Sequence, residues 1–175
     1  MNEKNKKEYR EASGRVTRET TALEALSVAI YNEQSAFDFY TKLSEAIRNE
    51  SGKKKFRFLA MDERRHRTLL EDYYKKTTAG KGFPFDPSQV KVIQVQIKDG
   101  TTAAEALDIG IKAEKEAYEF YSKCATEAKA PDAKKMFLML AEQEDRHYNL
   151  LTAEKQAVIG QFYWFDLGTK GIMDY

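Results

Sequence analysis

Two Glu-x-x-His pairs and two further glutamates are the residues whose types and spacing best suit chemistry. They are Glu33, Glu63 with His66, Glu114, and Glu144 with His147. Residues three apart lie on one face of an α-helix, so the glutamate and the histidine of each pair can reach one site. Carboxylate oxygens and imidazole nitrogens bind divalent transition metals. The pattern therefore indicates metal ligation, provided that the fold brings the four segments together.

These residues belong to an internal repeat. Residues 20–74 match residues 101–155 at 22 of 55 positions when the chain is offset by 81, without a gap. Self-similarity at a fixed period indicates a duplicated structural unit. The chain's only histidines, His66 and His147, are counterparts, and the four glutamates form two further pairs of counterparts. Each unit therefore carries half of the candidate ligands.

Each unit is predicted to consist of two long helices. Apolar residues recur at steps of three and four, and helix-forming residues dominate. Capping boxes begin the first helix at Thr21 and the third at Thr102, and Pro131 suits the first turn of the fourth. Residues 49–52 are expected to end the first helix. The expected helices are 21–48, 53–76, 102–129 and 131–157, paired as two antiparallel hairpins.

The linker between the two units is too long for a hairpin turn. Residues 77–100 contain two of the three prolines and an extended-looking run from Val90 to Ile97. Each helix is about 35 to 40 Å long, a length that about twelve extended residues cover. The linker can therefore cross the whole bundle and leave the third helix parallel to the second. The expected fold is an all-α, antiparallel four-helix bundle of two repeated hairpins joined by a long crossover.

All six candidate ligands fall on the apolar stripes that should face the core. The stripe of the first helix reads Leu26, Ile30, Glu33, Phe37, Tyr40 and Ile47, and that of the third reads Leu107, Ile111, Glu114, Tyr118, Tyr121 and Ala125. The second and fourth helices likewise place each Glu-x-x-His pair among leucines and aromatic residues. The sequence thus predicts four carboxylates and two imidazoles in the middle of the core.

Four carboxylates buried together need positive charge beside them. Buried ions lose their hydration, and like charges in one site repel each other. No Lys or Arg occupies the four stripes. Two divalent ions supply the charge that balances four carboxylates, so the charge balance favours two metals over one. Duplication for helix packing alone is the alternative, but it predicts apolar residues at the six positions.

The donor set favours iron. A carboxylate-rich shell with two nitrogens suits iron or manganese better than zinc, which prefers four-coordinate nitrogen and sulfur sites, although manganese or zinc could occupy the site as purified. A histidine that binds a metal through one ring nitrogen needs a hydrogen-bond partner for the other, which we call the outer nitrogen. The candidates here are Asp62, Asp145 or backbone carbonyls. Tyr40 and Tyr121 either donate to a ligand carboxylate on a facing helix or belong to a plain aromatic core.

Composition limits the partners and the location. Lys and Arg number 29 against 28 Asp and Glu, and no basic stripe is present, so no nucleic-acid partner is expected. No apolar run approaches the roughly 18 residues that cross a bilayer, which predicts a cytoplasmic protein without a membrane partner. The single cysteine, Cys124, excludes internal disulfides and Cys-x-x-Cys metal sites and is interpreted as a small buried hydrophobe. Arg65 and Arg146 are expected to be surface charges or outer neighbours of the ligands.

Three segments are expected. Residues 1–19 form a charged tail, residues 20–159 form the bundle, and residues 160–175 form an aromatic extension. The extension contains Phe162, Tyr163, Trp164 and Phe165, which are expected to cap a bundle end or a dimer contact.

Over residues 20–157 the chain resembles the rubrerythrin branch of the ferritin-like di-iron proteins. The resemblance is carried by Glu33, Glu63-x-x-His66, Glu114 and Glu144-x-x-His147, with Tyr40 and Tyr121 similar to tyrosines beside the family's ligands. It implies a ferritin-like fold and two iron ions held by these six residues, with Glu63 and Glu144 bridging. It also implies reduction of hydrogen peroxide or dioxygen, with ferroxidase activity, in oxidative-stress defence, and a homodimer.

Two departures from the family pattern shape these expectations. Rubrerythrins proper carry a rubredoxin domain, which one cysteine cannot build, so a separate donor such as a rubredoxin-like protein is expected to supply electrons. They also carry an additional glutamate on the third helix, whereas positions 110, 111, 117 and 118 here are Gly, Ile, Ala and Tyr. The symmetric site is more like the six-ligand centre of bacterioferritin. The alternatives are a non-catalytic iron-binding or storage protein of ferritin type, and a zinc site that only stiffens the bundle.

Overall fold

The computed structural model describes residues 22–47, 50–90 and 102–159, which form four long helices and one short turn of 3₁₀-helix. The elements are α2 (Ala22–Ala46), α3 (Glu50–Thr77), η1 (Pro87–Gln89), α4 (Ala103–Glu127) and α5 (Pro131–Ile159). No strand occurs within these ranges. The prediction of an all-α fold is therefore confirmed.

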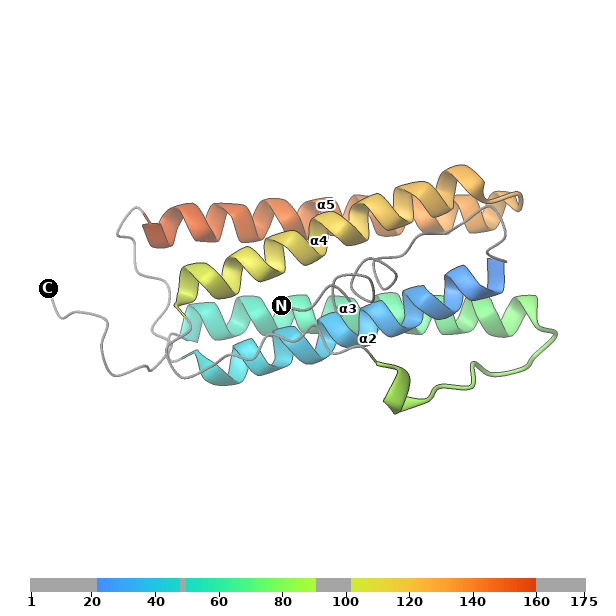
Figure 1. Cartoon of the computed structure of the whole chain (residues 1–175), viewed down its shortest axis with the longest axis horizontal. Helices are drawn as coiled ribbons and strands as arrows, with labels where there is room; N and C mark the ends of the chain where they lie inside the picture. The colour runs from blue at the N-terminus through green and yellow to red at the C-terminus, as the bar shows by residue number, and fades with distance from the viewer. Residues whose placement is uncertain (1–21, 48–49, 91–101, 160–175) are drawn as a thin grey trace, which may run out of the picture.

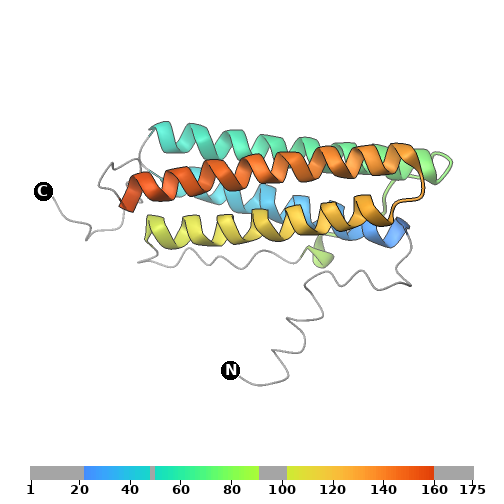
Figure 2. The ribbon, with the colours of Figure 1, turned by 90° about the horizontal axis from the view of Figure 1, so that it is seen from above.

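The four helices pack as two hairpins. Helices α2 and α3 form one antiparallel pair, α4 and α5 form the other, and the pairs lie side by side (Figure 1). Helix α3 ends at the opposite end of the bundle from the start of α4, so these two helices run in the same direction (Figures 1 and 2). The connection from Thr77 to Ala103 thus joins opposite ends of the bundle, as the predicted crossover requires. Most of the extended run, residues 91–97, lies outside the described residues.

The helix starts follow local signals, with one correction. Thr102 Oγ1 accepts from the Glu105 backbone N–H at 3.2 Å while the Glu105 carboxylate accepts from the Thr102 N–H at 2.8 Å, which confirms the capping box. Helix α5 begins at Pro131, as predicted. The first helix ends before residues 49–52, as predicted, but α3 begins at Glu50 instead of at the predicted residue 53. An acidic residue in the first turn favours that start electrostatically. Thr21 lies outside the described residues.

The chain leaves α3 through a tight turn and then packs back onto the bundle. Gly80 has a φ of +92° and donates its N–H to the Lys75 carbonyl at 2.8 Å, which ends the helix. Phe83 and Phe85 then pack against Tyr31 of α2, with ring centroids 5.5 and 5.3 Å away. The first part of the crossover is therefore held against the α2–α3 hairpin.

The buried core consists of two apolar clusters. One contains Leu26, Ile30, Leu70, Tyr121, Phe137 and Leu140, and the other contains Tyr40, Leu43, Phe56, Leu59, Leu107 and Leu151. Three expectations about the stripes of the first and third helices need correction, because Tyr118 is 42% exposed and Phe37 and Ile111 are only partly buried. A residue four positions after a core residue lies about 40° to one side of it, and this rotation carries Tyr118 away from Glu114 towards solvent.

Cys124 lies in the first of these clusters. Burial raises the pKa of its thiol to about 11, so the sulfur stays a neutral apolar group at ordinary pH. None of the helices described is long and apolar enough to span a membrane. The predicted tail (1–19) and aromatic extension (160–175) lie outside the described residues.

Candidate metal centre

The structure brings all six predicted ligands together in the middle of the bundle. Each helix contributes at least one of them, and the Glu-x-x-His pairs come from α3 and α5. None of the six residues is more than 4% exposed. They form two groups in which the potential ligand atoms lie within 4.8 Å of one another. Glu63 and Glu144 belong to both groups.

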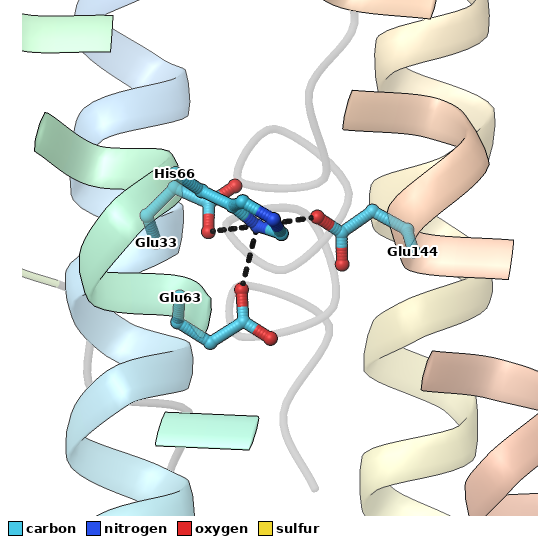
Figure 3. A group of neighbouring side chains, drawn as sticks. All are labelled: Glu33, Glu63, His66 and Glu144. Carbon is cyan, nitrogen blue, oxygen red and sulfur yellow. Dashed lines mark hydrogen bonds and ion pairs between the residues drawn. The ribbon is translucent and has the colours of Figure 1, made fainter. Parts of the chain in front are cut away.

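The first group surrounds the inner ring nitrogen of His66 (Figure 3). Its Nδ1 lies 3.4 Å from Glu33 Oε2, 3.2 Å from Glu63 Oε2 and 3.0 Å from Glu144 Oε1. The three carboxylates come from three different helices, so both hairpins contribute to the group. The geometry places one nitrogen and three oxygen donors around one point.

The second group surrounds the inner ring nitrogen of His147 in the same way. Its Nδ1 lies 3.0 Å from Glu63 Oε1, 3.7 Å from Glu114 Oε2 and 3.6 Å from Glu144 Oε2. Glu63 and Glu144 therefore present one oxygen to each histidine, as a carboxylate that bridges two metals would. The two imidazole rings stack with centroids 5.7 Å apart.

The two tyrosines complete a symmetric inner arrangement. Tyr40 on α2 donates to Glu114 Oε1, and its counterpart Tyr121 on α4 donates to Glu33 Oε1. Of the two alternatives for the tyrosines, the structure adopts the hydrogen bond to a carboxylate on the facing helix. Both phenols are almost wholly buried, so each hydrogen bond also fixes the orientation of its carboxylate.

Gly110 stands at one of the positions where the additional family glutamate is missing, and its closeness to other helices was not predicted. A Cβ atom at this position would lie 3.4 Å from Tyr40 Oη and 3.0 Å from Leu151 Cδ1. The absent side chain therefore avoids a tight contact with Leu151 and lets Tyr40 pack closely against α4. A glycine in a helix interior, where the repeat has Ala29, was the available signal.

The pKa shifts divide the six groups into those that bind a proton more tightly than usual and those that favour the ionised form. Burial, reinforced by the charges of Glu144 and Glu63, raises the pKa of Glu33 well above its usual value. Burial likewise raises the pKa of Glu114. Burial alone would raise the pKa of Glu63 as well, but hydrogen bonds from His147 and His66 outweigh it and leave that pKa lowered. The pKa of Glu144 is lowered by the same two histidines, against burial and the charge of Glu63.

The pKa values of both histidines are raised, in contrast to those of Glu63 and Glu144. Burial lowers the pKa of each imidazole, but hydrogen bonds to the surrounding carboxylates outweigh burial and raise the pKa of both His66 and His147 far above the usual range. Without metal, these shifts therefore favour protons on Glu33, Glu114 and both imidazoles. Four protons then balance the four carboxylates, which is the charge that two divalent ions would supply.

The residues fit a pair of metal ions. Four buried atoms of the cluster make no well-aligned hydrogen bond, although each lies 3.0 to 3.4 Å from an atom of another ligand; they are Glu33 Oε2, Glu63 Oε1, Glu144 Oε1 and His147 Nδ1. Buried polar atoms without such a bond are costly, and metal ligation would satisfy each of these. The donor set of four carboxylates and two imidazoles also matches the preferences of iron and manganese. The cluster can therefore hold two cations, with Glu63 and Glu144 shared between them.

The outer ring nitrogens face unlike partners. His147 Nε2 lies 3.5 Å from Asp62 Oδ2, and His66 Nε2 donates to Gln143 Oε1 at 2.9 Å. Asp62 was among the predicted partners, whereas Gln143 was missed. The prediction for Asp145 is wrong, because this exposed carboxylate accepts from Asn149 instead. Asp145 directly follows Glu144, and one further residue rotates a side chain by about 100° around the helix axis.

The two arginines near the ligands lie on the surface. Arg65 donates to Asp62, and Arg146 pairs with Glu142 at 3.7 Å. Both arginine side chains are more than 60% exposed, at 68% and 63%. Arg65 is therefore an outer neighbour of the centre through Asp62, whereas Arg146 is a surface charge.

Comparisons with known proteins place this arrangement in context. A family model described as rubrerythrin matches residues 24–155, which include all six candidate ligands and both tyrosines. Among solved structures, a hypothetical protein from Pyrococcus furiosus is similar, with 28% sequence identity and a TM-score of 0.69 over 83% of this chain and 94% of that chain. The comparison with curated proteins finds no match.

Proposed function

The chain belongs to the rubrerythrin family of ferritin-like di-iron proteins, and we propose on this basis that it is a di-iron oxidoreductase that reduces hydrogen peroxide. The observation that carries the proposal is the convergence of four buried carboxylates and two imidazoles into two groups that share Glu63 and Glu144. Such a centre would hold two metal ions, which together could act on one small oxidant.

The ligands divide between the two ions according to the distances. Glu33 and His66 would hold one ion, Glu114 and His147 would hold the other, and the carboxylates common to both groups would bridge them. When bound, two ferrous ions supply the two electrons with which hydrogen peroxide and two protons become two water molecules. The donor set suits iron, and manganese remains a chemical alternative for the same ligands.

The protein's own groups orient the ligands and keep bulk water out. Burial, then the charges of nearby glutamates, raises the pKa of both Tyr40 and Tyr121 well above the usual value, so both phenols stay protonated at neutral pH. Each phenol can therefore keep donating to its glutamate and hold the carboxylate in a fixed direction. The apolar clusters that contain these two tyrosines exclude bulk water from the centre.

Electrons for repeated turnover would come from a separate donor such as a rubredoxin-like protein. A rubredoxin-type iron centre needs several cysteines, and these 175 residues contain one. The buried thiol of Cys124 lies in an apolar cluster, which makes it a poor redox partner. The proposal therefore needs a reductant outside these 175 residues that approaches the bundle surface.

The proposal is tested by comparing two oxidants on the reduced centre. Protein loaded anaerobically with two equivalents of ferrous iron is mixed with hydrogen peroxide or with air-saturated buffer, and ferric absorbance is followed by stopped flow. We expect faster oxidation with peroxide, because reduction of peroxide needs only the two electrons that one centre holds. The variant Glu114→Gln should lose the rapid phase, whereas Glu116→Gln, on the same helix but 60% exposed, should keep it.

Two results would count against the proposal. Equal or slower oxidation with peroxide would contradict a peroxidase. Gel filtration at the size of a large cage, instead of a small oligomer such as a homodimer, would favour ferritin-type storage.

A further inference from the structure

The two histidines of the centre have unlike outer partners at equivalent places in the repeat. Asp62 and Gln143 are counterparts at the offset of 81, and each directly precedes the shared glutamate of its own helix. Each reaches across to the histidine of the other hairpin, Asp62 to His147 at 3.5 Å and Gln143 to His66 at 2.9 Å. One histidine therefore faces a carboxylate, and the other faces a neutral amide.

This difference stands out because the inner residues are identical in the two units. Both units supply one lone glutamate, one Glu-x-x-His pair and one tyrosine, and the structure pairs each tyrosine with the other unit's glutamate. The inner residues alone would make the two metal positions equivalent. The groups on the outer nitrogens break this equivalence.

Neighbouring charges do not cancel the difference. Arg65 donates to Asp62 Oδ1, which leaves Oδ2 directed at His147, and the Arg65 side chain is 68% exposed and screened by water. Arg146, the counterpart of Arg65, pairs with Glu142 at 3.7 Å instead of with Gln143. The carboxylate is thus held in place at one position, whereas at the other the described residues offer the outer nitrogen of His66 the neutral amide of Gln143.

We propose that Asp62 and Gln143 are positioning residues that make the two metal positions unequal, so that the position of His147 and Glu114 binds a divalent ion more tightly than the position of His66 and Glu33. A carboxylate beside the outer N–H of an imidazole makes the inner nitrogen a stronger donor. Asp62 Oδ2 lies at ion-pair distance from the outer nitrogen of His147, 3.5 Å away. A neutral amide fixes the ring but donates less electron density. The inference rests on the proposed two-metal centre.

Single-position variants of the full chain separate the two sites. His66→Ala leaves the position of His147 complete, and His147→Ala leaves the position of His66 complete. The affinity of each variant for Co(II), a divalent probe that is stable in air, is measured by competition with a chromophoric chelator. We expect His66→Ala to bind one ion about tenfold more tightly than His147→Ala does.

The outer residues are then changed in both backgrounds. Asp62→Asn should weaken Co(II) binding about tenfold in the His66→Ala protein and leave the His147→Ala protein unchanged. Gln143→Glu should tighten binding in the His147→Ala protein, a gain that misfolding cannot imitate. Glu142→Gln, a change at an exposed side chain beside Gln143, should alter neither affinity.

The outcomes distinguish this inference from the proposed function. If the unmodified protein binds fewer than two Co(II) ions, the two-metal centre and the inference both fail. If it binds two ions but the single-position variants have equal affinity, or Asp62→Asn weakens both alike, the centre stands and only the inference is overturned.

Discussion

Metal binding should release protons in a defined ratio to the ions bound. Four groups of the centre hold a proton more strongly than usual in the metal-free protein, namely Glu33, Glu114, His66 and His147. All four must lose that proton before they can act as ligands, because metals bind carboxylates and neutral imidazoles. Two divalent ions replace these four protons without a change in the net charge of the centre. We therefore expect about four protons to be released per two ions at neutral pH.

The number of protons released on metal binding also determines how the metal affinity depends on pH. Each proton released on binding costs about 1.4 kcal/mol per pH unit as the pH falls. Four protons thus make the combined binding of two ions weaker by about 5 kcal/mol for each unit of acidification. The affinity should fall steeply as the pH falls through neutrality, because burial and hydrogen bonding favour the protonated forms of these groups.

Proton release can be measured directly. Metal-free protein in a weakly buffered solution with an indicator dye is titrated with Co(II), which avoids the protons that accompany iron oxidation. Glu116→Gln should release as many protons as the unmodified protein, since Glu116 is exposed, whereas Glu114→Gln should bind fewer ions and release fewer protons. Release of one proton or none per two ions would refute the reasoning, because it would mean that the buried groups are already free of protons or that the metals bind elsewhere.

Three further predictions concern stability and affinity. In metal-free protein the two glutamates and two histidines with raised pKa bind protons more tightly when folded, so stability should fall as the pH rises from about 6 to about 9. Thermal unfolding in the presence of a chelator tests this, and a rising Tm contradicts it. Tyr40→Phe should weaken Co(II) binding about tenfold, because Glu114 loses its donor, while Tyr118→Phe at an exposed position should not. Lys55→Met should cost about 1 to 3 kcal/mol in urea unfolding, because it leaves the buried Glu154 without its cation. Lys53→Met, which breaks an exposed pair, should cost much less, and equal costs would contradict the role of burial.

The position of the ligands could be predicted because two independent patterns agree. The apolar stripes place Glu33 and Glu114 in the core. The repeat makes these two glutamates counterparts, so it requires them to lie at equivalent depths. The antiparallel hairpins and the crossover then follow from helix length and linker length. These arguments need only periodicity and distance, both of which a sequence contains.

The remaining details depend on rotation around a helix by one residue, which periodicity does not resolve. Tyr118 was expected to face inwards but is exposed, and Asp145 was expected beside a histidine where Gln143 is found instead. The role of Gly110 was missed for a related reason, because the space it leaves exists only when Tyr40 and Leu151 approach from two other helices. Contacts between helices that are distant in sequence decide these features.

The central claim is that buried acidic side chains are held in this bundle by two bound cations. Anomalous diffraction from crystals of iron-loaded protein, with data collected at the iron absorption edge, tests it most directly. We predict two peaks, one beside His66 and Glu33 and the other beside His147 and Glu114, with Glu63 and Glu144 between them. A single peak, or two peaks outside this cluster, would contradict the claim.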